Sequence, residues 1–242
     1  MKELRLLEHI EYISVSISPT TLVGEKLFYD PRIGRSIQQF KIEENGEEES
    51  VQVMVLPALD GLWYIFIYDC MMLEEIKIET TPWNKSLTSP CFANLTYVEI
   101  RSCHGLKDLT WLLFAPNLTQ LHVEDSEQLE EIISKEKAAS VLSENNNIIP
   151  FQKLEELSLE DLPELKSIYW NALPFQRLRE LYISGNSCPK LRKLPLNSKS
   201  VFNVENFVIE CPHDKEWLER VEWEDEATRL RFLPSCKVWT TG

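Results

Sequence analysis

Apolar residues recur along this chain in a short phrase that is clearest at residues 178–186, LRELYISGN. A leucine is followed by an apolar residue three positions on, by another two positions later, and then by a small polar residue. Apolar and polar positions alternate over the middle of the phrase, which is the period of a β-strand, and the final residue suits a tight turn. The phrase therefore predicts one short strand and a turn, the unit of a leucine-rich repeat.

Eight copies of this phrase predict a repeat solenoid. Their first apolar positions are Ile10, Ile37, Leu62, Leu95, Leu118, Leu154, Leu178 and Val204. These positions give spacings of 27, 25, 33, 23, 36, 24 and 26 residues, and five of the seven fall within the roughly 20–29 residues typical of the repeat class. The two longer spacings contain polar insertions at 79–91 and 134–150, and we expect the second insertion to be a mobile loop.

We expect an α/β solenoid of the leucine-rich-repeat horseshoe type. Its concave face would be a parallel β-sheet of about eight short strands, and its convex side would be irregular or made of short helices. Residues 1–210 would form the repeats. Residues 211–242 would form a helical C-terminal cap, because apolar residues from 215 to 234 follow a helical spacing. No polar cap precedes the first copy, which suggests that the N-terminal end is truncated.

Two dipeptides and two cysteines support this repeat assignment. Pro150-Phe151 and Pro174-Phe175 each precede a copy of the phrase, and a rigid turn at proline would direct the aromatic ring into the core. Cys70 and Cys103 occupy the turn position that closes a repeat strand, where a small buried side chain is expected. The six cysteines show no disulfide spacing, so we expect a reduced, cytoplasmic protein.

The charge balance limits the classes of partner. The 242 residues include 39 Asp and Glu against 25 Lys and Arg, which gives a formal net charge of −14 at pH 7. So acidic a chain is not expected to bind nucleic acid, because that binding depends on neutralising phosphates. The sequence has no run of 18 apolar residues, so we expect no membrane span.

The sequence has no motif that predicts catalysis or a bound cofactor. It lacks the glycine-rich G-x-x-x-x-G-K-[ST] and G-x-G-x-x-G stretches, so no phosphate-binding loop is expected. Cys211 and His213 form the nearest group of metal-ligand type, but no second pair follows at zinc spacing. The histidines fall in no recognisable catalytic context. We expect no enzyme activity, no metal and no cofactor in this segment.

The outward positions of the strands predict a protein-binding surface on the concave face. That face is aromatic at one end and acidic toward the other, and exposed aromatic residues are enriched at protein interfaces. The predicted binding residues are Tyr64, Phe66, Tyr68, Tyr97, Glu99, Arg101, Glu124, Glu156, Glu160, Glu180 and Tyr182, and Gln120, His122, Ser158 and Ser184 share their face. An alternative is that the insertion at 79–91 folds over the aromatic residues.

Several stretches are more specific than the repeat pattern requires. They are CHGLKDLTWLLFAPNLTQL at 103–121, followed by PELKSIYWNALPFQRL, LRKLPL and ERVEWEDEATRLRFLPSC, and they fall within residues 92–236. These stretches resemble the C-terminal leucine-rich repeats of coiled-coil-class plant NBS-LRR disease-resistance proteins, which are intracellular immune receptors. The resemblance implies a nucleotide-binding switch domain that holds ADP or ATP and is missing from this chain. Any peripheral association with the plasma membrane would come through missing N-terminal regions.

The resemblance implies that the module binds proteins. Repeats of that family restrain the switch domain in cis and sense a pathogen effector, directly or through a guarded host protein. The chain departs from the whole family because it lacks the phosphate-binding loop. Two alternatives remain open: a substrate-recruiting repeat domain of a ubiquitin ligase, which would require an F-box-like segment upstream, and a stand-alone scaffold.

Overall fold

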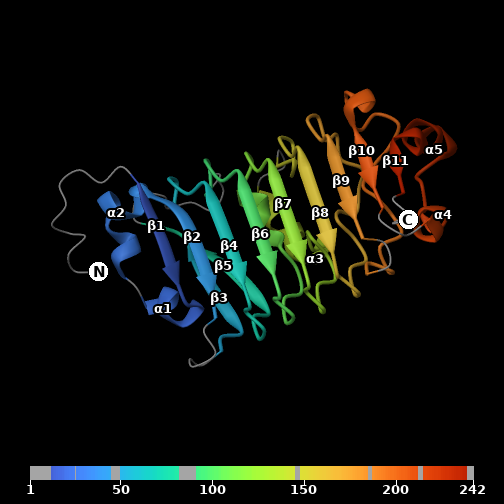
Figure 1. The fold of residues 1–242 in the computed structure, drawn as a ribbon. Helices are drawn as coiled ribbons and strands as arrows, with labels where there is room; N and C mark the ends of the chain where they lie inside the picture. The colour runs from blue at the N-terminus through green and yellow to red at the C-terminus, as the bar shows by residue number, and fades with distance from the viewer. Residues whose placement is uncertain are drawn as a thin grey trace.

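The computed structural model describes residues 12–24, 26–44, 50–81, 91–144, 148–184, 187–211 and 215–238. Within these ranges, nine strands form one sheet in which every neighbouring pair is parallel (Figure 1). In order across the sheet, the strands are β1 (Ile13–Ile17), β2 (Ile37–Glu43), β4 (Tyr64–Tyr68), β6 (Tyr97–Arg101), β7 (Gln120–Glu124), β8 (Glu156–Glu160), β9 (Glu180–Ile183), β10 (Val208–Glu210) and β11 (Cys236–Lys237). The parallel order confirms the predicted leucine-rich-repeat solenoid.

Each of the eight predicted copies contributes one strand to this sheet. The prediction of about eight strands missed β11, which pairs with β10 through Ile209 and Cys236. Two residues are too few for the alternation of apolar and polar positions to reveal a strand. The opening position of the first copy, Ile10, lies outside the described residues, although its strand β1 is present.

The opposite side of the solenoid has more regular structure than predicted. Strands β3 (Val53–Pro57) and β5 (Glu75–Glu79) form a separate parallel pair in which Met54 lies opposite Ile76. The helices are α1 (Pro19–Gly24), η2 (Lys26–Tyr29), α2 (Pro31–Ser36), η3 (Thr110–Phe114), α3 (Lys135–Glu144), η4 (Val204–Asn206), α4 (Lys215–Arg220), α5 (Glu226–Phe232) and η5 (Leu233–Ser235). Throughout the described part of the chain, every helix is too short or too polar to cross a bilayer.

Helix α3 corrects the prediction of a mobile loop in the second insertion. Ala138 is buried, and Lys137 Nζ lies 2.8 Å from Asp108 Oδ2 and 2.9 Å from Glu75 Oε1. The Ser134 N–H, just before the helix, donates to Thr110 Oγ1. The polar composition concealed this helix, which attaches to the solenoid through ion pairs, through the buried Ala138 and through the partly buried Val141 and Leu142 that pack against the core. Residues 145–147 lie outside the described residues.

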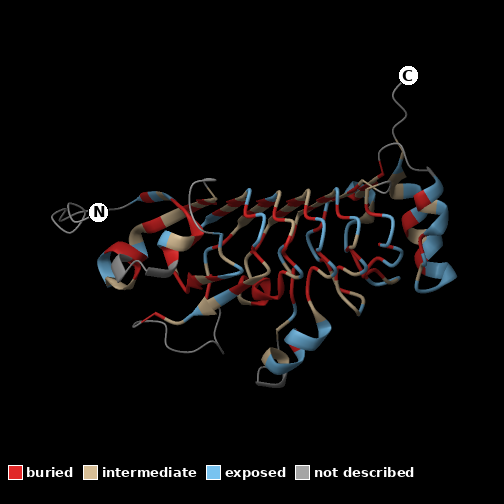
Figure 2. Ribbon diagram, turned by 90° about the horizontal axis from the view of Figure 1, so that it is seen from below, coloured by how far each residue is buried: buried red, intermediate tan, exposed pale blue. Residues whose placement is uncertain are grey.

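The core lies between the large sheet and the convex segments (Figure 2). Inward residues stand opposite one another across the strands, as Leu121, Leu157, Leu181 and Ile209 do, and all four are buried. Both aromatic rings of the Pro-Phe dipeptides are buried, as predicted. Phe151 and Phe175 adopt φ values of 60° and 42°, a left-handed conformation that is uncommon for residues other than glycine.

The C-terminal segment folds as two short helices, where the sequence pattern predicted one helical segment. Asp225 begins α5 by accepting hydrogen bonds from the Thr228 N–H and hydroxyl, both at 2.6 Å, which separates α5 from α4. Trp217 is buried, and its indole N–H donates to the Leu191 carbonyl at 2.8 Å. Phe232 is also buried and packs edge-to-face on Phe207. Both helices lie at the C-terminal end of the sheet (Figures 1 and 2).

Replacing Leu157 by alanine should lower the free energy of unfolding by about 2–5 kcal/mol, because a buried leucine leaves a cavity when it is truncated. Ser158→Ala, one residue away on the outward face, should change it by less than about 0.5 kcal/mol. Urea denaturation of both variants measures the difference. Equal midpoints for Leu157→Ala and the parent would contradict the strand register.

Candidate protein-binding site on the concave face

Parallel register places the predicted binding residues in three rows on the sheet face that points away from the core, called the concave face from here on. The first row is Gln39, Tyr64, Tyr97, Gln120, Glu156 and Glu180; the second is Lys41, Phe66, Glu99, His122, Ser158 and Tyr182; the third is Glu43, Tyr68, Arg101, Glu124 and Glu160. All eleven predicted residues lie in these rows. Residues opposite one another on neighbouring strands are close enough for their side chains to interact.

The aromatic residues of β4 and β6 form one continuous cluster. The Tyr97 ring centroid lies 6.3 Å from that of Tyr64 and 5.5 Å from that of Phe66, and Phe66 lies 6.1 Å from Tyr68. His122 extends the cluster onto β7, with its ring 5.3 Å from Tyr97. Tyr64 exposes 39% of its surface, and the other three aromatic residues are half-buried. These contacts fix the rings in place while leaving part of each surface open to a partner.

A polar network borders the cluster at the carboxyl ends of β4 and β6. The Tyr97 hydroxyl donates to Glu99 Oε2 at 2.7 Å, and Arg101 Nε lies 2.7 Å from Glu99 Oε1 and 3.2 Å from Glu124 Oε2. Tyr68, Glu99 and Arg101 also line a hollow of about 400 Å³. The geometry therefore brings together five residues that the sequence pattern had placed on one face.

Burial and the Glu99 carboxylate raise the pKa of two tyrosines above the ordinary value of about 10, at which a phenol is already neutral at physiological pH. Burial first, and then the negative charge of Glu99, raise the pKa of Tyr68 to about 12. Burial and the hydrogen bond to Glu99 raise the pKa of Tyr97 as well. Both phenols are therefore neutral at physiological pH, and the arrangement offers apolar rings and hydroxyl groups to a protein surface.

The other end of the concave face carries carboxylates that repel one another. Burial, followed by the charges of Glu124 and Asp161, raises the pKa of Glu160. Burial, followed by the charges of Glu156 and Glu210, raises the pKa of Glu180. A raised carboxyl pKa means that the local environment disfavours the negative charge, so a cationic partner would relieve the repulsion.

Glu156 connects the acidic end to the aromatic cluster. One carboxylate oxygen accepts a hydrogen bond from Gln120 Nε2 at 3.0 Å, and the other lies 3.5 Å from His122 Nε2. Gln120 and His122 had been assigned to this face without a binding role. Their contacts with Glu156 and Tyr97 place them inside the candidate site.

Sequence reasoning also missed Lys41 and Glu43 on β2. Lys41 Nζ lies 5.6 Å from the centroid of the Tyr68 ring and 2.6 Å from Glu43 Oε2, so it adds a cation to the aromatic end. The signal was present in the sequence, because Phe40 and Ile42 are inward positions, so alternation directs Lys41 between them and Glu43 after them outward. The alternative in which the first insertion covers the aromatic cluster concerns residues 82–90, which lie outside the described residues.

Comparisons with known proteins match most of the chain. The family described as plant disease resistance protein RPS2-like, leucine-rich repeats, matches residues 73–203. Over 240 residues the chain is 63% identical to disease resistance protein RFL1 of Arabidopsis thaliana, an alignment that covers 98% of this chain and 26% of RFL1.

Two further relatives come from the same plant. The chain is 50% identical to disease resistance protein RPS5 of Arabidopsis thaliana over 241 residues, which cover 98% of this chain and 26% of RPS5. It is 48% identical to disease resistance protein SUMM2 of the same species over 233 residues, which cover 95% of this chain and 25% of SUMM2. The chain thus spans about a quarter of the length of these curated relatives.

The raised pKa of Glu180 predicts how stability depends on pH. The folded state retains a proton on this carboxyl that the unfolded chain releases, so stability falls as pH rises from the unfolded value, about 4.3, through the folded one. Glu180→Gln should therefore raise the urea midpoint at pH 7, by an amount equivalent to about a few tenths of a kcal/mol, since the carboxyl is partly screened by solvent. This increase in the urea midpoint should disappear below about pH 4, where the carboxyl of the parent is protonated in both the folded and the unfolded state.

Glu219→Gln is the matched control, because Glu219 is exposed on α4, away from the concave face. It removes the same charge and should leave the midpoint nearly unchanged at both pH values. A Glu180→Gln variant less stable than the parent at pH 7 would contradict the repulsion described for the acidic end.

Proposed function

Because the chain belongs to the RPS2-like leucine-rich-repeat family of plant disease-resistance proteins, we propose that it is a protein-interaction module of an intracellular immune receptor. Its concave face restrains a nucleotide-binding switch domain in cis and senses a pathogen effector or a guarded host protein. The aromatic cluster of Tyr64, Phe66, Tyr68 and Tyr97 is the observation that carries this proposal.

The cluster supports binding because its rings already hold one another in place. Binding normally costs conformational entropy when exposed side chains become fixed at an interface, and that cost is smaller for side chains that are already ordered. Aromatic residues also account for a large share of the binding energy in many interfaces. The anchors of the contact are therefore the four aromatic side chains of the cluster, Tyr64, Phe66, Tyr68 and Tyr97.

The acidic end supports a basic partner. The formal net charge of −14 and the raised pKa values of Glu160 and Glu180 both favour a partner that brings positive charge to β8 and β9. Such complementarity accelerates association, and the acceleration weakens as salt screens the field beyond roughly 10 Å at 0.1 M.

The module acts by binding, without catalysis and without a cofactor of its own. ADP or ATP would be held by the switch domain, which belongs to a part of the receptor outside this chain. We place the site of action in the cytoplasm, where that switch domain would meet the concave face. In the described part of the chain the six cysteines form no disulfide bond and five of them are buried, which suits a reducing compartment.

Two triple variants separate the anchoring role from the steering role. Tyr64→Ala, Phe66→Ala and Tyr68→Ala together should weaken binding to the switch domain of a family member chiefly through faster dissociation, because they remove buried contact area. Glu156→Lys, Glu160→Lys and Glu180→Lys together should chiefly slow association, and more so at low salt. Surface-plasmon resonance at two salt concentrations measures both rates.

Matched controls lie away from the concave rows. Met71→Ala with Met72→Ala removes exposed apolar area in the turn after β4. Glu127→Lys, Glu136→Lys and Glu219→Lys make the same charge change in the turn after β7 and on helices α3 and α4. Parent-like kinetics in both concave variants would remove the role proposed for this face. Within a whole receptor, the aromatic variant should signal without pathogen, because the resting state of the switch is no longer favoured.

A further inference from the structure

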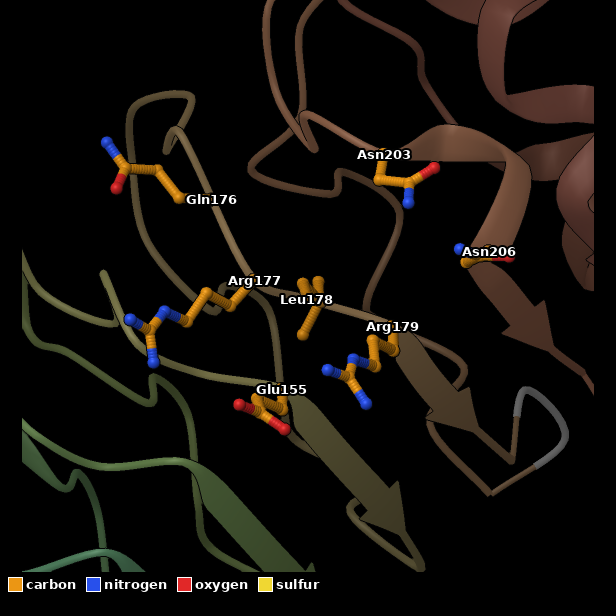
Figure 3. A pocket seen from close by; sticks show the side chains of 7 residues that line it. All are labelled: Glu155, Gln176, Arg177, Leu178, Arg179, Asn203 and Asn206. Atoms are coloured by element: carbon orange, nitrogen blue, oxygen red, sulfur yellow. The ribbon is translucent and has the colours of Figure 1, made fainter.

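A second cavity lies at the amino ends of β8, β9 and β10. It has a volume of about 530 Å³ (Figure 3). Arg177 and Arg179 line it from the approach to β9, Asn203 and Asn206 from the segment before β10, and Glu155 from the start of β8. Three successive repeats therefore build this pocket, from positions outside the rows of the concave face.

Two guanidinium groups at the cavity have no ionic partner within the described ranges of the chain. Among the described residues, neither Arg177 nor Arg179 forms an ion pair or a side-chain hydrogen bond, although Arg101 and Arg229 each pair with a carboxylate. Both arginines are exposed. A guanidinium presents donors in a planar fork that matches a carboxylate, so two free forks at one cavity favour an anionic ligand.

The backbone beneath these side chains is held firmly. The Arg179 N–H donates to the Glu155 carbonyl at 2.8 Å, and its carbonyl accepts from the Val208 N–H at 2.8 Å. Leu178, between the two arginines, is buried in the core. The solenoid therefore fixes where both side chains begin and leaves their charged ends free, which lowers the cost of ordering them around a ligand.

Glu155 determines what kind of anion fits. Its carboxylate belongs to the same cavity, so two positive charges and one negative charge leave a net charge of about +1. A single carboxylate matches that balance better than a doubly charged phosphate does, because Glu155 repels each added negative charge. The amides of Asn203 and Asn206 can each donate and accept hydrogen bonds, as a peptide backbone requires.

An exposed aromatic residue lies next in sequence to Asn203, which lines the cavity. Phe202 precedes Asn203 and exposes 90% of its surface, more than any other large apolar side chain in the described part of the chain. Its neighbour Val201 is buried, and the Val201 carbonyl accepts a hydrogen bond from Arg231 Nη2 on α5 at 2.8 Å. Fixed backbone on this side presents the Phe202 ring to solvent, where it can pack on an apolar side chain of a ligand.

We infer that this cavity is a docking site for a short peptide segment of a partner protein, in which a Glu or Asp side chain enters between Arg177 and Arg179 and an adjacent apolar side chain packs on Phe202. This cavity favours a negatively charged partner, whereas the acidic end of the concave face favours a positively charged one. It therefore gives the module a second point of attachment that does not depend on the proposed function of that face.

Nuclear magnetic resonance of the 242-residue chain tests the inference through the Nε–H signals of its arginines. The probe is the capped dipeptide acetyl-Glu-Leu-amide, with acetyl-Gln-Leu-amide as its neutral match and inorganic phosphate as the competing anion. The Glu peptide should shift the Arg177 and Arg179 signals saturably. The Gln peptide should bind at least tenfold more weakly, and phosphate should not displace the Glu peptide at equal concentration.

Variants assign the effect to the cavity. Arg177→Gln with Arg179→Gln should abolish saturable binding of the Glu peptide, and Phe202→Ala should weaken it several-fold. Lys153→Gln with Lys199→Gln removes the same charge from exposed residues that do not line the cavity and should leave binding unchanged. Equal affinity for both peptides, stronger binding of phosphate, or unchanged binding in the double arginine variant would overturn the inference.

Discussion

The structure depends on one recurring backbone contact at the entrance to strands β6, β7, β8 and β9. The Thr96 carbonyl accepts hydrogen bonds from Thr119 N and Gln120 N at 2.9 and 3.0 Å, and the Thr119 carbonyl accepts from Glu155 N and Glu156 N at 2.7 and 3.1 Å. This contact sets the register between successive repeats, and the register decides which side chains become neighbours. Core leucines, the aromatic cluster and the repelling carboxylates are three consequences of the same alignment.

The sequence pattern was sufficient for eight of the nine strands of the large sheet, because alternation is a local signal that each of these strands carries in its own residues. The inward positions of β8 and β9, Leu157 and Leu181 among them, could be assigned without any knowledge of their neighbours. Other elements depend on tertiary contacts. Strand β11 is too short to show a period, and the ion pairs of Lys137 with Asp108 and Glu75, which help to attach helix α3, follow no periodicity.

The same distinction applies to the candidate sites. Alternation assigns a residue to the concave face, but it cannot tell which carboxyl groups repel one another or that Lys41 lies over the Tyr68 ring. The cavity lined by Arg177 and Arg179 is harder to predict from the sequence. Its lining residues come from three repeats, at positions that precede the strands. An overall charge of −14 also hides a local excess of positive charge, since composition averages over the entire surface.

The place of the insertions has an evolutionary consequence. The repeat that begins at Leu118 is 36 residues long and includes helix α3, yet Gln120 still lies directly opposite Glu156, just as Tyr97 lies opposite Gln120 across a repeat of 23 residues. Extra length is absorbed on the convex side and leaves the rows in alignment. Convex segments can therefore be gained or lost by insertion and deletion while selection acts separately on the side chains of the rows. The binding preference of the concave face and the length of the repeats can then diversify at independent rates.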